Sequence, residues 1–137
     1  MITIRQAGIA DTREMAQLLT AIIHKGGTTA LVTPVNGADI ANWMAQDPDQ
    51  SAWHVAVDET GGIAGFQWIG PHPKLPPQAC DVATFVRIGK NGLGIGSALF
   101  EATKRAARAC GFAWINATIR ADNDGDLAFV DFNRAVF

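Results

Sequence analysis

The sequence lacks the features that mark nucleic-acid-binding, secreted and membrane-spanning proteins. Its formal charge is only −2 over 137 residues, so the chain as a whole has no attraction to nucleic acid or to anionic lipid. No stretch approaches the roughly 18 apolar residues of a membrane span, and residues 1–12 lack the charged and apolar regions of a secretory signal. We therefore expect a cytoplasmic protein with no nucleic-acid partner and no membrane partner.

Cysteine is also scarce. The two cysteines, Cys80 and Cys110, are too few for a disulfide framework. Neither lies in the CxxC or Cys/His spacing that is typical of a metal site. We expect both to be reduced thiols, and we expect no metal.

The chain does contain a regular alternation between the periodicities of strands and helices. Its length fits one domain, residues 1–137, with a single core. The order β-α-α-β-β-β-α-β-α predicts an α/β or α+β domain with a mixed sheet. The expected strands cover 1–7, both arms of a hairpin over 51–70, 79–88 and 112–119, and the expected helices cover 11–24, 38–46, 95–109 and a last helix over 127–135.

Four glycines lie within eight positions at the start of the helix expected at 95–109, in the string GKNGLGIGSALF over residues 89–100. A glycine-rich turn between a strand and a helix exposes several backbone N–H groups, and the helix dipole adds partial positive charge there. A tight turn alone would need only one or two glycines. The expected ligand is therefore an anion, most often a phosphate.

Spacing excludes two common phosphate motifs. A P-loop requires Lys-Ser or Lys-Thr after its last glycine, whereas Ile95 and Gly96 follow Gly94. The dinucleotide fingerprint requires a third glycine where this chain has Ser97, and no acidic residue follows at the expected distance.

The string NGLGIGSALF resembles the pyrophosphate loop of the GNAT superfamily of acyl-CoA N-acyltransferases, whose pattern is Gln/Arg-x-x-Gly-x-Gly/Ala. Asn91 stands where that family usually has Arg or Gln. INATIRADNDGDLAF is similar to the second cofactor motif, with Asn123 at the family's asparagine. GGTTA, ATFV and NATIRADN resemble the phosphinothricin-acetyltransferase-like branch.

The resemblance implies a sheet that opens between its fourth and fifth strands to hold acetyl-CoA as cosubstrate. Backbone groups at Phe85 and Val86 would bind pantetheine, and the loop amides would bind the pyrophosphate. The cofactor-binding residues implied are Phe85, Val86, Asn91, Gly92, Leu93, Gly94, Ile95, Gly96, Ser97 and Asn123.

The reaction implied is transfer of the acetyl group to a primary amine of a small molecule or an amino-acid-like acceptor, by direct attack. Asp81 is the candidate base, because the family often has an acidic residue on that strand; the alternative is a strand-end residue paired with water or Arg87. His54 is interpreted as a core residue, and Glu14 as a helix cap together with Asp11. The tryptophans are interpreted as core and rim residues, with Trp43 near the place where the family's amines enter.

Two departures from the family favour a second hypothesis. Most members have a tyrosine in the last helix that protonates the thiolate, but this chain has no tyrosine, and Val130 or Phe132 stands there. The family also continues past its last helix into two more strands, which this sequence lacks. The alternative function is a catalytically impaired acyl-CoA-binding relative.

The absence of those strands predicts an unpaired apolar edge on the strand over 112–119. Either a second copy of the chain covers that edge, as a homodimer would, or the chain is truncated at its C-terminus.

Overall fold

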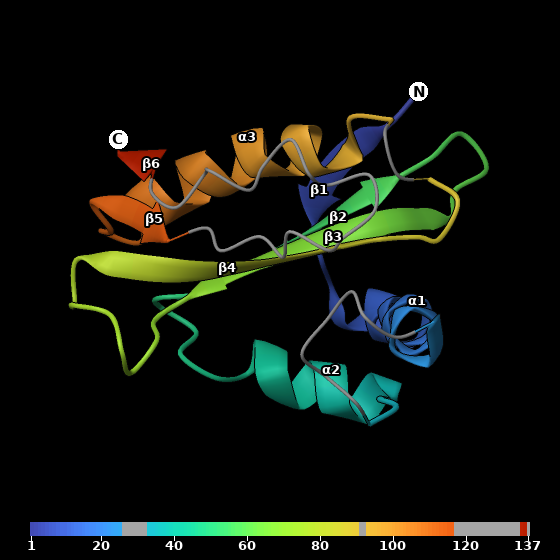
Figure 1. Cartoon of the computed structure of the whole chain (residues 1–137), viewed down its shortest axis with the longest axis horizontal. Helices are drawn as coiled ribbons and strands as arrows, with labels where there is room; N and C mark the ends of the chain where they lie inside the picture. The colour runs from blue at the N-terminus through green and yellow to red at the C-terminus, as the bar shows by residue number, and fades with distance from the viewer. Residues whose placement is uncertain (26–32, 91–92, 117–134, 137) are drawn as a thin grey trace.

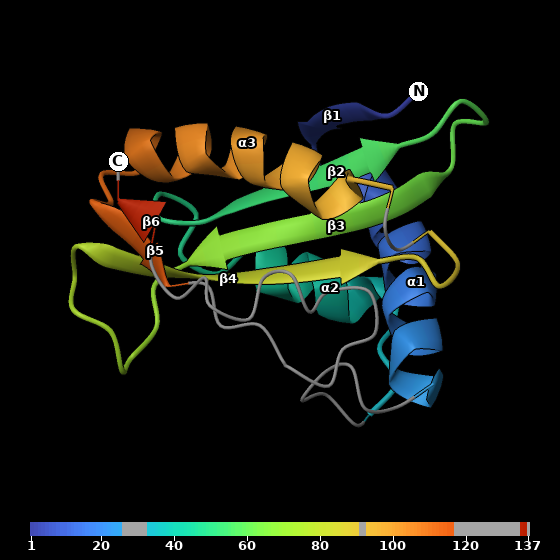
Figure 2. The same cartoon turned by 45° about the horizontal axis from the view of Figure 1, so that its top comes forward.

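The computed structural model describes residues 1–25, 33–90, 93–116 and 135–136. A mixed sheet lies between two helical layers, with α1 and α2 on one face and α3 on the other (Figure 1; Figure 2). Its strand order is β1-β2-β3-β4-β5-β6, which confirms the mixed α/β class. The strands are β1 (Thr3–Gln6), β2 (Ala52–Val57), β3 (Ile63–Gly70), β4 (Ala79–Val86), β5 (Trp114–Asn116) and β6 (Ala135–Val136), and the helices are α1 (Thr12–Lys25), α2 (Gly37–Met44) and α3 (Ile95–Ala109).

The predicted hairpin is present as β2 and β3, which pair antiparallel around residues 58–62. The Asp58 carboxylate accepts hydrogen bonds from the backbone N–H groups of Thr60 and Gly62, and Gly61 adopts a φ of 85°. A side chain that bonds to the backbone two residues on, followed by a glycine in the left-handed region, is a common turn chemistry. This turn sets the register that places Trp53 opposite Trp68.

Alternation along the strands divides the core into two layers. Val55 and Phe66 face α1 and α2, where they pack with Met15, Leu19 and Ile40. On the other face, the buried sheet residues Ala56, Ala64, Ile69, Cys80 and Ile115 lie in the clusters that also contain Ile95, Leu99 and Ala107 of α3.

The sheet changes direction between β4 and β5. These two strands are parallel and pair only at 79–81 with 114–116 in the part of the chain that the structure describes, although β4 continues to Val86. Residues 82–86 pair with β3 on their other side. Alternate backbone groups along this second half of β4 therefore face away from β3.

The expectation of an unpaired edge on β5 is wrong at two residues. Trp114 and Ile115 pair antiparallel with Val136 and Ala135 of β6. The backbone N–H and C=O groups on an open strand edge can form hydrogen bonds with any extended segment that lies beside it, and here that segment is β6. The argument for a second copy over this edge therefore does not apply to Trp114 and Ile115.

The expected last helix over 127–135 falls outside the described residues, except for Ala135. That residue lies in β6, not in a helix. The element that follows β5 among the described residues is therefore a strand, where the predicted order had a helix.

The prediction that Asp11 and Glu14 cap the first helix is also wrong. Asp11 ends a 3₁₀ turn (Ile9–Asp11), and its carboxylate accepts from the Gly8 N–H at 2.7 Å and from two nitrogens of Arg5 at 2.8 and 2.9 Å. The Arg5 guanidinium lowers the pKa of Asp11 below its usual range.

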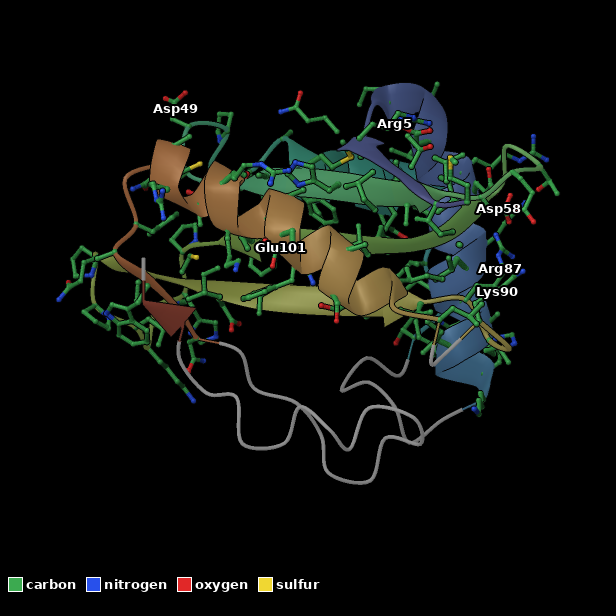
Figure 3. All side chains as sticks on the ribbon, turned by 90° about the horizontal axis from the view of Figure 1, so that it is seen from above. Arg5, Asp49, Asp58, Arg87, Lys90 and Glu101 are labelled. Carbon is green, nitrogen blue, oxygen red and sulfur yellow. The ribbon has the colours of Figure 1, made fainter. Side chains whose placement is uncertain are left out.

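Glu14 instead bridges α1 to the sheet. Its Oε2 accepts from the backbone N–H of Ile63 at 2.6 Å and lies 3.4 Å from Nη2 of Arg87. Arg87 in turn donates to the Ile63 carbonyl through Nε at 2.9 Å and Nη2 at 2.7 Å. These contacts hold the start of β3, the residue after β4 and α1 together, at the end of the sheet from which the chain turns into α3 (Figure 3).

Candidate functional site

The N-terminus of α3 has the features of a helix end that can bind an anion. Gly94 is its N-cap, with φ 77° and ψ 12°, so it occupies the left-handed region that glycine adopts without strain. A glycine cap has no side chain to accept from the first N–H groups, and the first turn contains no acidic residue. The N–H groups of Ile95, Gly96 and Ser97 therefore have no carbonyl partner one turn earlier in the helix.

The first turn of α3 lies directly against β3 and β4. A Cβ on Gly65 of β3 would lie 2.9 Å from the Phe85 carbonyl oxygen and 3.0 Å from Cγ2 of Ile95, so only glycine permits this approach. A Cβ on Gly96 would lie 3.8 Å from Cγ2 of Thr84. The uncapped helix end is thus next to residues 82–86 of β4, for which the described part of the chain contains no partner in β5.

Six of the predicted cofactor-binding residues lie at these positions. Phe85 and Val86 form the end of β4, and Gly94, Ile95, Gly96 and Ser97 form the cap and first turn of α3. Ile95 is buried and would contribute only its backbone, whereas the side chain of Leu93 is exposed. Of the remaining predicted residues, Asn91, Gly92 and Asn123 lie outside the described residues.

A cleft of about 250 Å³ opens on the other face of β4, beside α2. Its walls combine the end of α2 and the segment after it with the facing side chains of three strands. They are Trp43, Gln46, Asp47, Ser51, Trp53, Trp68, Ala83 and Phe85.

Aromatic rings form most of this wall. The ring of Trp53 lies 6.1 Å from that of Trp68 and 6.4 Å from that of Phe66, and the Phe66 ring is 5.0 Å from that of Phe85. Sequence reasoning treated Trp53 and Trp68 as core and rim residues. The hairpin register would have placed them side by side, and that pairing was the available signal for an aromatic site.

Asp81 lies on the same face of β4 as Ala83, two residues before it, and its Cα partners are Gly70 and Asn116. It is partly buried, but it is not among the residues that line the cleft. The alternative that Asp81 pairs with Arg87 is wrong, because the Arg87 guanidinium is bonded to Glu14 and to the Ile63 carbonyl. Arg87 is six residue steps from Asp81, which on an extended chain span about 20 Å.

Neither cysteine resembles a reactive nucleophile. Both are free, and burial raises the pKa of the Cys80 thiol to about 12. Among the described residues, no group of three His, Cys, Asp or Glu side chains could hold a metal ion. In the same part of the chain, no helix is long and apolar enough to cross a bilayer.

His54 lies on the α3 face of the sheet, away from the cleft. It is 8% exposed, and its Nδ1 is buried without a hydrogen-bond partner. Burial, with a smaller contribution from the positive charge of Arg105, lowers the pKa of His54 below its ordinary value of 6.5. The core interpretation of His54 is confirmed.

The lowered pKa of His54 makes stability depend on pH. Below about pH 6.5 His54 is protonated in the unfolded chain but less so in the folded chain, because its pKa is lower there. The free energy of unfolding therefore decreases as the pH falls, by at most about 1.4 kcal/mol per pH unit for this group. We expect the urea midpoint of unfolding to decrease when the pH is lowered from 7.5 to 5.5. The midpoint of the His54→Gln variant should decrease less over the same range. Equal slopes for the two proteins would show that His54 does not titrate in this way.

Solved structures with a similar fold are named as acetyltransferases. No family model matches the sequence, and no curated protein matches it. A GCN5-related N-acetyltransferase from Kribbella flavida is 26% identical, with a TM-score of 0.71 over 83% of this chain and 69% of that one. Ribosomal-protein-alanine N-acetyltransferase from Brucella melitensis is 22% identical, with a TM-score of 0.81 over 92% and 79% of the two chains.

A GNAT superfamily phosphinothricin acetyltransferase from Sinorhizobium meliloti, solved in complex with acetyl-CoA, is 23% identical; its TM-score is 0.78 over 93% of this chain and 70% of that one. All three match this chain over most of its length. The chain therefore has the fold of the GNAT superfamily of acetyltransferases.

Proposed function

We propose that this protein transfers an acetyl group from acetyl-CoA to a primary amine. The observation that carries the proposal is the uncapped, glycine-led N-terminus of α3 beside residues 82–86 of β4, which pair with β3 and, among the described residues, have no partner in β5. An anion-binding helix end and a free strand edge next to each other match a ligand with a phosphate group at one end and amides along its length. The phosphinothricin acetyltransferase with the same fold was solved with acetyl-CoA, which supports this choice of cosubstrate.

The cosubstrate and the acceptor are proposed to bind at different sides of β4. At the start of α3, the N–H groups at 95–97 would bind phosphate. In the adjoining segment Phe85–Val86 the backbone groups that face away from β3 are those of Val86, because Arg87 donates to the Ala64 carbonyl at 2.8 Å and antiparallel bonding alternates, and these would bind the amides. On the α2 side, the cleft reaches Ala83 and Phe85 of the same strand and would hold the acceptor. Acetyl-CoA supplies the thioester carbonyl that an uncharged amine attacks directly.

Asp81 is the proposed base that removes a proton from the amine, since its side chain lies on the cleft face of β4. A positioned general base contributes roughly 10²–10⁴-fold to rate, so we expect Asp81→Asn to lower kcat/KM about 100-fold at pH 7. Acetyl-CoA affinity should stay the same, because Asp81 is four residues before the strand segment assigned to the cofactor. The measurement is thiol release from acetyl-CoA in the presence of a panel of primary amines.

Glu59→Gln is the acid-to-amide control, because Glu59 is exposed in the turn between β2 and β3 and is not among the residues that line the cleft. If Asp81→Asn retains full activity, Asp81 is not the base, although the reaction class would stand.

The second candidate, acyl-CoA binding without turnover, is favoured by one observation: the chain contains no tyrosine to act as the general acid. Acetyl-CoA binding together with no thiol release for any amine would support it.

A further inference from the structure

The cleft beside α2 has a composition that selects among amines. Three indole side chains and one phenyl ring, from Trp43, Trp53, Trp68 and Phe85, provide an apolar wall. Aromatic walls of this kind bind apolar groups by desolvation and bind cations over the ring faces. A volume of about 250 Å³ fits a small molecule of roughly the size of one aromatic side chain with a short tail.

The charge of the cleft has one sign. Of the eight described residues that line it, Asp47 is the only charged one, and it is an acid. No arginine, lysine or histidine is among these eight, so they offer no partner for a carboxylate or a phosphinate. An acceptor that carries an anionic group would be placed against Asp47 and desolvated by indole rings, which is unfavourable.

The backbone at Asp47 adds a second observation. Its φ is 48°, and it is the one residue other than glycine with a positive φ in the described part of the chain. Its carbonyl accepts from the Gln50 N–H at 2.9 Å, which closes the turn between α2 and β2. The turn therefore holds an acidic residue in an uncommon conformation at the cleft wall.

We propose that the acceptor is an amine with an aromatic or apolar group and no anionic group, an arylalkylamine in chemical class, and not an amino acid. This inference rests on the proposed acetyl transfer and specifies its substrate. Asp47 favours the positively charged amine as it enters, the tryptophans bind the apolar group, and the contact with Ala83 and Phe85 brings the amine to β4.

The test compares two ligands that differ by one carboxylate, 2-phenylethylamine and phenylalanine. The chain has four tryptophans, of which three line the cleft, so binding can be followed by tryptophan fluorescence without any cosubstrate. Trp114→Phe removes the emission of the tryptophan on β5 and should leave the ligand-dependent signal in place. We expect 2-phenylethylamine to bind at least about tenfold more tightly than phenylalanine, from the combined effect of ring contacts and charge.

Variants at Asp47 and Trp68 assign the preference to the cleft. Asp47→Asn should reduce the ratio of the two affinities, and Asp47→Lys should reverse it. Trp68→Leu should weaken the binding of 2-phenylethylamine. The urea midpoint of this variant is measured as well, to establish that it is folded. Tighter binding of phenylalanine by the unmodified protein, or a ratio unchanged in both Asp47 variants, would overturn the inference.

Turnover separates this inference from the proposed function. If acetyl-CoA binds and amino acids are acetylated faster than 2-phenylethylamine, the reaction stands and the acceptor class is wrong. If 2-phenylethylamine binds with the expected preference but no amine is acetylated, the acceptor preference stands and the proposed reaction fails.

Discussion

Replacing Gly94 with tryptophan is expected to weaken acetyl-CoA binding at least about 100-fold, as measured by isothermal titration calorimetry. Gly94 is the cap of α3, and nothing lies within 4 Å of the position where its Cβ would be. A side chain there enters the space in front of the N–H groups at 95–97, where the pyrophosphate is proposed to bind. Loss of the several charge-assisted hydrogen bonds that it would make accounts for this magnitude.

Gly111→Trp is the matched control for this variant. Gly111 has a φ of 92°, also has open space at its Cβ position, and follows the opposite end of α3. Both substitutions place an L residue in the left-handed region, so each should cost about 1–2 kcal/mol of stability. Equal acetyl-CoA affinities for the two variants would mean that the cofactor does not bind at the start of α3.

The glycine motif could be identified from sequence because its physical demands are local. A left-handed cap, exposed N–H groups and the following helix all lie within residues 89–109, and the structure has the cap and helix in place. The hairpin over 51–70 was predictable for the same reason. Asp58, Gly61 and the alternating apolar residues on either side specify it without reference to the rest of the chain.

The parts that sequence reasoning missed depend on contacts between distant residues. Glu14 has the spacing of a helix cap, but its partners are 49 and 73 residues away, at Ile63 and Arg87. The cleft likewise combines α2 with three strands, and no local pattern distinguishes Trp53 and Trp68 from ordinary core residues. The pairing of β6 with the edge of β5 requires the chain to return to that edge, and the periodicity of residues in the sequence does not predict this.

The two proposed ligands meet at β4 because its residues alternate between the faces of the sheet. Val86 contributes its backbone to the strand edge on which the cofactor is proposed to lie, and the neighbouring Phe85 contributes its side chain to the aromatic wall of the cleft. Adjacent strand residues point to opposite faces, so one short segment serves both sites. The packing behind this wall is therefore expected to affect acceptor binding as well as stability.

Phe66→Ala is expected to lower the free energy of unfolding by about 3–5 kcal/mol, as measured by urea denaturation. The Phe66 side chain is fully buried between the sheet and α1, and its ring contacts those of Trp53 and Phe85. Truncation to alanine would leave a cavity behind two residues of the aromatic wall, because the surrounding layers relax only in part.

Phe66→Leu separates stability from the shape of the cleft. Leucine keeps most of the buried volume, so the loss of unfolding free energy should be below about 1.5 kcal/mol, and the protein should remain folded for binding measurements. Without the ring that orients Trp53 and Phe85, the affinity for 2-phenylethylamine should still fall, while acetyl-CoA affinity should not change. If Phe66→Leu binds 2-phenylethylamine and acetyl-CoA as tightly as the unmodified protein does, the arrangement of the aromatic wall does not depend on Phe66. The packing behind the cleft would then contribute only to stability.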